Sequence, residues 1–519
     1  MDRPAVEVQL GPDRAAASLA PVRESSTTVS IMLERLKVLF SFPAMLGTLL
    51  FGVTFYSDRD FIVDPDLWWH IKIGQDILSS HHWPTTDPYS FTAMNAPWIA
   101  YEWLGEIVLG TAAKLGGNAA LDALLVVLGG AIILALYVCG TLRSGNSKAG
   151  FVAALILIPL ALPSFTLRPQ MFGYFFLPLL LIALEQFRKG AEWTAWCLPA
   201  LFLVWVNTHG SFIVGIGVLA VYLCSGLRSF RLGSVEAVAW TSRQRIKLEI
   251  ALLLSLVVLP VTPYGTQLAA YPFDMMFNQP VNIANVHEWK SMPFDQSFGK
   301  LFLGVTVLLI VLQIIFRFNW RLAEFVLAVG AAVMACVHAR MLLIFVPLVA
   351  PLFATVLARW LPPYQRLKDQ FVLNAILMAG AIAAMIYYAP SRNFLQDKVE
   401  KHYPVAAMHY LDVYKIPGPM LNSYTFGGYL VENGRKTFID GRGDLFERAG
   451  VLSDYLTLVE IKIGAFSVLD RYQIASCLLM RDEPLANVLT ASPNWKRVYV
   501  DDTSALFVRI ALNQPKPEK

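Results

Sequence analysis

Charged residues and cysteines are both scarce in this sequence. Of 519 residues, 15% are charged and 56% are hydrophobic, whereas soluble domains average about 25% charged and about 45–50% apolar residues. This excess excludes a soluble cytosolic enzyme and a disordered chain. The 42 basic and 38 acidic residues nearly balance, which argues against a nucleic-acid binder. The five cysteines form no CxxC pair, so neither a disulfide framework nor a zinc site is indicated.

Long apolar runs recur along the chain, and the mean hydropathy is +0.52. A helix that crosses a membrane needs about 20 predominantly apolar residues. We therefore predict a polytopic α-helical membrane protein with about 11 transmembrane helices. The runs cover residues 36–57, 119–142, 149–164, 170–187, 194–208, 211–227, 248–263, 300–316, 322–338, 341–359 and 371–389.

The charge of the loops orients these predicted spans. Residues 101–117 are also apolar, but they carry Glu102, Glu106 and Lys114, which are costly at the bilayer centre. If this segment does not cross, the basic loops share one side with the N-terminal tail, as the positive-inside rule requires. We therefore predict that residues 101–117 form a juxtamembrane or re-entrant helix on the outer side. The N-terminus is then cytoplasmic and the C-terminus extracytoplasmic.

Three regions follow from this topology. Residues 1–33 are polar and are predicted to be a disordered cytoplasmic tail. Residues 34–390 form the transmembrane domain, including an outer loop at 58–118. Residues 391–519 mix polar and apolar positions and are predicted to be a soluble extracytoplasmic α/β domain. In this domain "KTFIDG", "CLLM" and "RVYVDDTSALFVRI" are typical of strands, and "PLANVLTAS" of a short helix.

Unusual polar clusters gather at the predicted outer ends of the spans. Polar groups at membrane depth are costly and usually face a cavity or a partner. A cavity open to the outer side would therefore explain these clusters together. They are "DPDLWWH" (64–70), "HHWPTTDPYS" (81–90), "LRPQ" (167–170), "NTHGS" (207–211), "TPYG" (262–265), "HEW" (287–289) and "HAR" (338–340).

The segment after the first predicted span is the most informative. Asp64-Pro65-Asp66 predicts the start of a helix that runs to about Ser80. Asp66 and His70 would share one face of this helix, and Trp68 and Trp69 would anchor it among the headgroups. Each acid has two interpretations: a cap of an interfacial helix, or a carboxylate in the cavity that acts as general base or cation ligand.

These residues carry a resemblance to the GT-C superfamily of membrane glycosyltransferases. "DLWWHIK" (66–72) is similar to the oligosaccharyltransferase loop that begins with an Asp, and "SYTFGGYLVENGRKTFIDGRGD" (423–444) resembles the "WWDYG" region without its paired Trp and its Asp. The whole chain also resembles the RgtA/B/C/D-like bacterial membrane proteins. That likeness covers "DPDLWWHIKIGQDIL", "LRPQ", "WVNTHGSF", "TPYG", "EW" and "GGYL…FIDGR".

The resemblance implies a GT-C-like fold in the bacterial inner membrane. It also implies transfer of a sugar from a polyprenyl-phosphate donor to an extracytoplasmic glycan, lipid or protein. Asp66, with Asp64 as second choice, would take the acceptor proton, and direct displacement would invert the anomeric carbon. Arg168, Arg340, His209 and Lys72 are the predicted ligands of the donor phosphate. The resemblance identifies no definite cofactor and leaves metal dependence open, and Asp64 and Asp66 together could hold a divalent cation, Mg²⁺ or Mn²⁺.

Several residues have an ordinary interpretation beside the functional one. Both arginines could instead reach toward lipid headgroups, His209 could be a satisfied helix-end histidine, and Trp289 could belong to an interfacial belt. The predicted lining of the substrate cavity comprises His70, Glu102, Asn207, Tyr264, His287, Glu288 and Trp289.

Two other functions remain open at this stage. One is a transporter or flippase of a lipid-linked or small solute, which predicts ionisable residues inside the spans and broken helices. The other is a catalytically inactive GT-C-like scaffold. In every case the expected partners are membrane lipids, the polyprenyl-phosphate sugar and an extracytoplasmic acceptor, and no nucleic acid.

Overall fold

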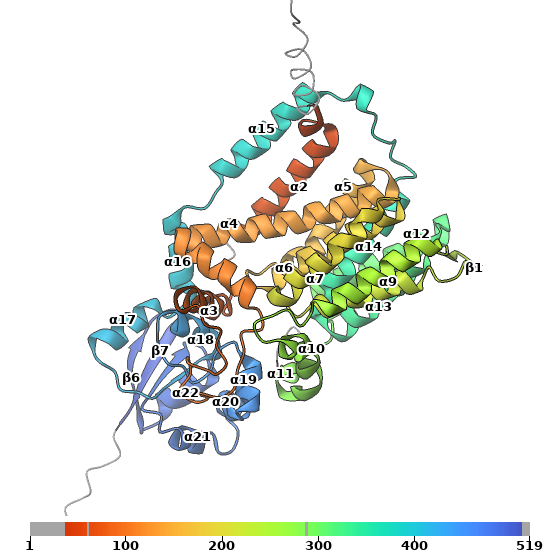
Figure 1. The fold of residues 1–519 in the computed structure, drawn as a ribbon. Coiled ribbons are helices and arrows are strands. Elements are labelled where there is room, and N and C mark those ends of the chain that lie inside the picture. Colours follow the sequence, from red (N-terminus) through yellow and green to blue (C-terminus); the bar gives the residue numbers. More distant parts are fainter. Residues whose placement is uncertain (1–36, 60–61, 286–288, 511–519) are drawn as a thin grey trace, which may run out of the picture.

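The computed structural model describes residues 37–59, 62–285 and 289–510, and these residues are mostly helical (Figure 1). Up to residue 390, apolar helices pack around the long helix α4, which contacts α2, α5, α6 and α14. The elements of this part are α2 (Phe42–Asp58), α3 (Leu67–Ser80), α4 (Trp103–Ser144), α5 (Ser147–Ala161), η1 (Leu162–Ser164), α6 (Gln170–Arg188), η2 (Glu192–Cys197), α7 (Leu198–Thr208), α8 (Phe212–Cys224), β1 (Phe230–Leu232), β2 (Val235–Ala237), α9 (Ser242–Val257), α10 (Thr266–Asn278), α11 (Pro280–Asn285), α12 (Ser297–Phe316), β3 (Trp320–Arg321), α13 (Leu322–Val337), η4 (Ala339–Met341), α14 (Leu342–Leu357), η5 (Arg366–Lys368) and α15 (Phe371–Tyr387).

Five helices in the described residues are long and apolar enough to cross a membrane: α4, Ser147–Ser164, α6, α12 and Ala339–Leu357. Helix α15 passes the same test together with α16 (Arg392–His402), to which it is bent by 54°, so the number rises to at most six. This chain is therefore a membrane protein, and its described residues contain fewer helices of spanning length than the predicted 11, so that number is not confirmed. The difference arises because some predicted runs form apolar helices of only 10–17 residues, such as α8 and α13.

Residues 103–116 form the first part of α4, and a kink at Gly117 separates them from the rest of this helix. A helix of its own in the predicted segment 101–117 therefore agrees with the structure, and its place on the outer side stays a prediction. The backbone at Gly117 adopts φ 57° and ψ −143°, a conformation that favours glycine, and this breaks α4 after its first turns. The part before the break packs against α3 at very short range. A Cβ at Gly74 would lie 1.9 Å from the carbonyl oxygen of Glu106, and one at Gly110 would lie 2.8 Å from the backbone nitrogen of Gln75. Glycine at both positions thus lets the two helices touch.

Helix α3 begins at Leu67, as the Asp64-Pro65-Asp66 sequence predicts. Trp68 and Trp69, however, are not headgroup anchors, because both are buried. The ring of Trp68 packs edge-on against Tyr403 and Tyr429. The two tryptophans therefore join the loop at 58–118 to the C-terminal part of the chain.

The C-terminal part combines a four-stranded sheet with short helices. The sheet order is β4-β5-β7-β6, in which β4 and β5 are parallel and the other pairs antiparallel. The elements that follow α16 are α17 (Val405–Val413), β4 (Met420–Asn422), α18 (Tyr424–Glu432), α19 (Gly443–Arg448), α20 (Val451–Val459), α21 (Ala465–Arg471), β5 (Ser476–Met480), α22 (Pro484–Ala491), β6 (Trp495–Val500) and β7 (Ser504–Arg509).

Three of the four local predictions for this part agree with the structure. "CLLM" lies in β5, "RVYVDDTSALFVRI" forms β6 and β7, and "PLANVLTAS" contains α22. The strand predicted for "KTFIDG" is wrong, because this segment is a buried loop. Asn422 holds the loop by accepting the backbone N–H of Phe438 at 2.8 Å and donating to the carbonyl of Ile439 at 2.8 Å. Thr437 forms a single parallel β-bridge with Ser90, and the side chain of Asn422 holds the residues that follow it.

The C-terminal part packs on the loop at 58–118. Buried residues of both regions form one hydrophobic cluster, in which Trp69 and Trp98 from the loop meet Phe438 and Phe446. The division of the chain at residue 390 therefore stays a prediction. This contact brings loop residues, helix ends and the C-terminal part together around the site described next.

Candidate active site

A polar cavity of about 110 Å³ lies where the loop at 58–118, several helix ends and the C-terminal part meet. We call it the Asp66 cavity. It brings together residues from segments that are far apart in the sequence. Those predicted from the sequence are Asp66, His70, Glu102, Arg168, His209, Trp289 and Arg340. Those that the sequence analysis missed are Trp69, Tyr101, Gln170, Met275, Asn282, Tyr424, Gly441, Gly443 and Asp444.

Arg168 binds both aspartates of the DPD segment. Its Nη1 lies 2.9 Å from Asp66 Oδ2, and its Nε lies 2.7 Å from Asp64 Oδ2. Asp64 also caps the turn, because its Oδ1 accepts the backbone N–H of Asp66 at 2.9 Å. Asp66 makes no side-chain cap bond to α3. The two interpretations of the aspartates therefore separate: Asp64 holds the turn and Arg168, while the Asp66 carboxylate lines the cavity.

Arg340 lies in η4, on another wall of the cavity. Its Nη2 donates to Gln170 Oε1 at 3.4 Å, and its guanidinium carbon lies 4.5 Å from the centre of the Trp289 ring. His338 holds this tryptophan by donating from Nδ1 to the Trp289 carbonyl at 2.6 Å. Within the described ranges, no carboxylate forms an ion pair with Arg340. This positive charge therefore has a neutral amide and an aromatic ring as neighbours.

Glu102 lies between two histidines. Its Oε1 is 3.3 Å from His209 Nε2, and its Oε2 is 3.6 Å from His70 Nε2. His209 Nδ1 accepts the backbone N–H of Ser211 at 3.1 Å. In a neutral imidazole the other nitrogen then carries the hydrogen, so His209 donates it to Glu102. On the far side, His70 Nδ1 lies 3.1 Å from Glu106 Oε1.

Burial shifts the protonation of this cluster. It raises the pKa of Glu102 to about 8, although Arg340 and Arg168 oppose the shift. It lowers the pKa of His209 to about 3 and holds the pKa of His70 well below its usual range. A low-dielectric surrounding disfavours the charged form of each group. At neutral pH both histidines are therefore neutral, and Glu102 mostly keeps its proton.

Two glycines let the C-terminal loop close the cavity. A Cβ at Gly441 would lie 1.9 Å from Asp66 Oδ1 and 2.5 Å from Trp69 Nε1, and one at Gly443 would lie 2.5 Å from Asn282 Oδ1. Between them, the fully buried Arg442 fixes the loop, because its guanidinium pairs with two aspartates. Nη1 is 2.6 Å from Asp87 Oδ1, and Nη2 is 2.7 Å from Asp440 Oδ2.

Four predicted site residues lie outside the cavity lining. Asp64 lies behind Arg168, and Lys72 pairs with Asp76 at 2.5 Å. Asn207 accepts the indole N–H of Trp103 at 2.9 Å, and the Tyr264 hydroxyl donates to the Pro84 carbonyl at 2.9 Å. These side chains connect segments of the fold. The predicted His287 and Glu288 lie outside the described residues.

Some of the missed residues had a signal in the sequence. Tyr101 directly precedes the quoted "EW" motif, Gln170 ends the quoted "LRPQ" motif, and Gly441 to Asp444 belong to the quoted segment 423–444. Met275 and Asn282 had none, because they lie in α10 and α11, in a loop that the polar clusters did not single out. Neighbours within a motif were thus predictable, and residues brought in by the fold were not.

The arrangement of the two aspartates does not fit a divalent cation. Arg168 lies between Asp64 and Asp66 and contacts both carboxylates, where a shared cation would bind. In the residues that the structure describes, no group of three His, Cys, Asp or Glu side chains could hold a metal ion. We therefore assign no cation ligands.

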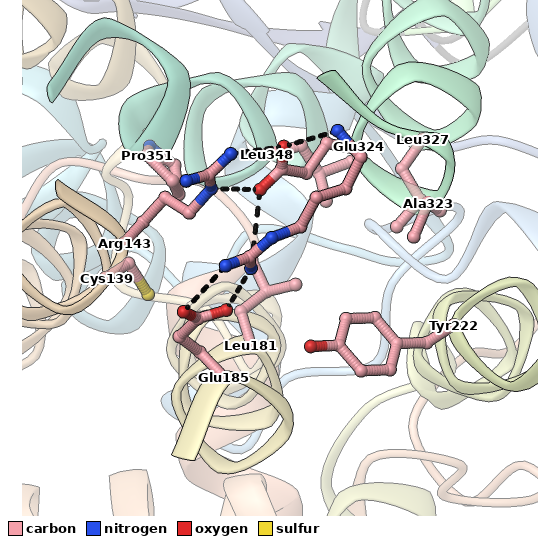
Figure 2. Close-up of a pocket in the computed structure, with 11 residues that line it drawn as sticks. Cys139, Arg143, Leu181, Glu185, Tyr222, Ala323, Glu324, Leu327, Leu348 and Pro351 are labelled. Atoms are coloured by element: carbon pink, nitrogen blue, oxygen red, sulfur yellow. Dashed lines mark hydrogen bonds and ion pairs between the residues drawn. The ribbon is translucent and has the colours of Figure 1, made fainter. Parts of the chain in front are cut away.

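A second pocket, of about 60 Å³, lies at the other end of α6 (Figure 2). Its charges bind one another: Arg321 pairs with Glu185 at 2.5 Å, and Arg143 pairs with Glu324 at 2.5 Å. We call these four residues the Arg321 network. They hold α4, α6 and the start of α13 together. The network contains no charge without a charged partner, so it is a structural feature.

Comparison with protein-family models and with curated protein sequences gives no match. Solved structures do match. An oligosaccharyltransferase of Archaeoglobus fulgidus, tethered to an acceptor peptide, aligns over 85% of this chain and 70% of its own, with a TM-score of 0.52 and 12% identity. The mycobacterial arabinofuranosyltransferase AftD aligns over 89% of this chain and 41% of its own, with a TM-score of 0.50 and 12% identity.

ArnT of Cupriavidus metallidurans, bound to undecaprenyl phosphate, aligns over 91% of this chain and 98% of its own, with a TM-score of 0.49 and 15% identity. All of these proteins are membrane glycosyltransferases. The fold predicted from the DPD segment and the accompanying motifs is confirmed: this chain has the fold of the GT-C superfamily of membrane glycosyltransferases.

Proposed function

We propose that this protein is a membrane glycosyltransferase that moves a sugar from a polyprenyl-phosphate donor to a hydroxyl of a glycan, lipid or protein. The observation that carries this proposal is one cavity, in a GT-C fold, that combines two arginines with the carboxyl groups of Asp66 and Glu102. Glycosyl transfer from a lipid phosphate needs cations for the leaving group and a base for the acceptor. The Asp66 cavity contains both kinds of group.

The donor phosphate would bind between Arg168 and Arg340. Arginine binds phosphate through paired N–H groups and keeps its charge at any physiological pH. Arg340 has no carboxylate partner among the described residues, and Arg168 can exchange part of its contact with Asp66 for a phosphate. His209 lines the same cavity as a neutral donor. Lys72 has no part in this proposal, because it pairs with Asp76.

Asp66 would act as the general base. Its Oδ2 binds Arg168, and its Oδ1 accepts the indole N–H of Trp69 at 3.3 Å. A phosphate that draws Arg168 away leaves the Asp66 carboxylate less neutralised and more basic. The acceptor hydroxyl would then lose its proton to Asp66 as its oxygen bonds to the anomeric carbon. Direct displacement of the phosphate inverts that carbon.

The donor chemistry also suggests where the protein works. We propose the inner membrane of a bacterium, with a cytoplasmic N-terminus and an extracytoplasmic C-terminus, because the basic loops fit that orientation. The Asp66 cavity would then open toward the extracytoplasmic side, where lipid-linked sugars meet their acceptors. The arabinofuranosyltransferase and the oligosaccharyltransferase that share the fold are glycosyltransferases, which supports the reaction class.

The test uses purified protein in lipid vesicles, a mixture of labelled polyprenyl-phosphate sugars and membrane extract as acceptor. Asp66→Asn removes the charge with almost no change in shape. We expect transfer to fall on the order of 10²–10⁴-fold, the range that a general base contributes. Asp76→Asn is the matched control, because Asp76 lies on the same helix outside the cavity lining. No transfer by folded wild type, or full transfer by Asp66→Asn, would contradict the proposal.

A further inference from the structure

The two carboxyl groups of the Asp66 cavity lie in opposite electrostatic surroundings. Asp66 contacts the Arg168 guanidinium at 2.9 Å. Glu102 is buried and has neutral imidazoles as its nearest polar neighbours, at 3.3 and 3.6 Å. Two carboxyl groups whose surroundings favour different protonation states can serve as base and acid in one reaction. The proposed function uses only the first.

The hydrogen bonds around Glu102 leave one of its oxygens available. Oε1 accepts the hydrogen that His209 carries on Nε2, because the backbone of Ser211 occupies Nδ1. Oε2 faces His70 Nε2 at 3.6 Å, which is beyond a normal hydrogen bond. A proton on Oε2 is therefore free to move to a ligand in the cavity.

A second carboxyl group stands behind His70. Glu106 Oε1 lies 3.1 Å from His70 Nδ1, and Glu106 Oε2 is buried without a hydrogen-bond partner among the described residues. When Glu106 donates its proton to His70 Nδ1, the neutral imidazole carries its hydrogen on Nε2, on the side of Glu102. This geometry connects Glu102, through one imidazole, to a buried group that can exchange a proton with it.

The two arginines place the phosphate near this group. Arg340 and Arg168 interact electrostatically with Glu102, and all three side chains line the cavity. We propose, on the basis of the proposed function, that Glu102 is the general acid that protonates the leaving phosphate oxygen, and that His70 and Glu106 return a proton to it. Asp66 remains the base toward the acceptor.

The step balances as follows. The acceptor oxygen bonds to the anomeric carbon while the bond from that carbon to the phosphate oxygen breaks. The electron pair of the broken bond stays on the phosphate oxygen, which takes the proton from Glu102. The acceptor proton goes to Asp66. Polyprenyl hydrogen phosphate leaves. Glu102 then regains a proton from Glu106 through His70, and exchange with solvent restores the proton of Glu106 and returns Asp66 to its carboxylate form.

The direction of the pH dependence follows from the groups around Glu102. Glu102 must carry its proton, and its pKa is about 8, so transfer should fall as the pH rises through about 8. Arg168 and Arg340 lower this pKa, and acidic neighbours raise it. The titratable and charged groups around Glu102 are Asp66, His70, Tyr101, Glu106, Arg168, His209, Arg340 and Asp444.

The experiment compares pH profiles of wild type, Glu102→Gln and Glu432→Gln in the vesicle assay with the same labelled sugars and membrane extract. Burial raises the pKa of Glu432 to about 7, and this residue does not line the cavity, so it is a matched control. We expect wild type and Glu432→Gln to lose about tenfold in transfer rate per pH unit above about 8. Glu102→Gln should be slower on the order of 10²-fold and lack this decline.

Two further readouts separate chemistry from folding. Glu102→Gln still accepts the hydrogen of His209, so retention of the labelled donor and the KM for donor should change less than about threefold while kcat falls. Glu102→Asp keeps a carboxyl group, so its transfer rate should again fall with rising pH, in part as in wild type. A Glu102→Gln enzyme that transfers sugar with the wild-type pH profile would overturn the inference and leave the proposed function standing. Absence of transfer by wild type would overturn the proposed function itself.

Discussion

The Asp66 cavity and the Arg321 network lie toward opposite ends of α6 and use the same two residue types, arginine and glutamate. Gln170, at the start of α6, lines the cavity, and Glu185, near its end, belongs to the network. Fifteen residues of helix separate them, or about 22 Å at about 1.5 Å per residue. The comparison shows how one set of side chains can serve structure at one site and ligand binding at the other.

In the Arg321 network every charged group has a charged partner. Arg321 binds Glu185 through two nitrogens, at 2.5 and 3.3 Å, and Arg143 binds Glu324 in the same way, at 2.5 and 3.2 Å. Figure 2 shows the dashed contacts that connect the arginine and glutamate side chains drawn there. Paired geometry of this kind is strong and directional. A ligand would have to displace an existing partner to bind.

In the Asp66 cavity the pairing is incomplete. Arg340 has an amide and a ring as neighbours, and Glu102 has two imidazoles. The cavity is also larger, about 110 Å³ against about 60 Å³. Buried charges without a partner are costly unless something else compensates them. Under the proposed function a charged ligand would complete this site, whereas the charges of the network already pair with one another.

The largest expected effect comes from breaking the network. Arg321→Met leaves Glu185 with no cation that binds it through two bonds, and removing one partner of a fully buried pair costs about 3–5 kcal/mol. Because the Arg321 side chain is 23% exposed and that of Glu185 11%, we expect a loss of about 2–4 kcal/mol. Equilibrium unfolding in mixed detergent micelles measures this loss in the free energy of unfolding.

Arg340→Met is the comparison variant for this measurement. It removes a charge that has no carboxylate partner among the described residues, so its free energy of unfolding should change by less than about 1 kcal/mol. Equal destabilisation by the two variants would show that the cavity and the network do not differ in the way argued above.

The second effect concerns the close contact between Gly441 and Asp66. In Gly441→Ala the new Cβ would lie 1.9 Å from Asp66 Oδ1, so the carboxylate or the loop must move. A displacement of about 1 Å in a catalytic group can cost about 10²-fold in rate, and we expect a loss of that order in sugar transfer. Gly380→Ala, in α15, meets no atom within 4 Å and should transfer at the wild-type rate. Unchanged transfer by Gly441→Ala would place Asp66 outside the chemistry.

The sequence was informative where chemistry is local. Asp66 and His70 are four residues apart on α3 and both line the cavity, as the helical period predicts. Lys72 is two residues beyond His70, and a helix turns by about 200° over two residues. Its side chain therefore leaves the cavity face and meets Asp76. The helical period thus predicted that His70 lines the cavity, and it also predicted that Lys72 does not.

The sequence was uninformative where distant segments meet. The "KTFIDG" segment was predicted to be a strand, because nothing nearby in the sequence reveals the partners of Arg442, which follows it. One of them, Asp87, is 355 residues away. This ion pair bends the loop so that Gly441 reaches Asp66. Apolar runs likewise predicted membrane helices but not their lengths, which depend on turns such as those that end α8 and α13.

The smallest expected effect sharpens the comparison at Arg340 itself. If a ligand phosphate completes the site, Arg340→Met removes one charge-assisted contact, which is worth about 1.5 kcal/mol. Binding of labelled polyprenyl phosphate to the vesicle-embedded protein should weaken about tenfold. Arg359→Met is the matched control, because Arg359 is exposed and donates to the Phe316 carbonyl, far from the cavity lining. If both variants bind polyprenyl phosphate equally well, Arg340 binds lipid headgroups and not the donor phosphate. If only Arg340→Met weakens, its charge recognises the donor phosphate.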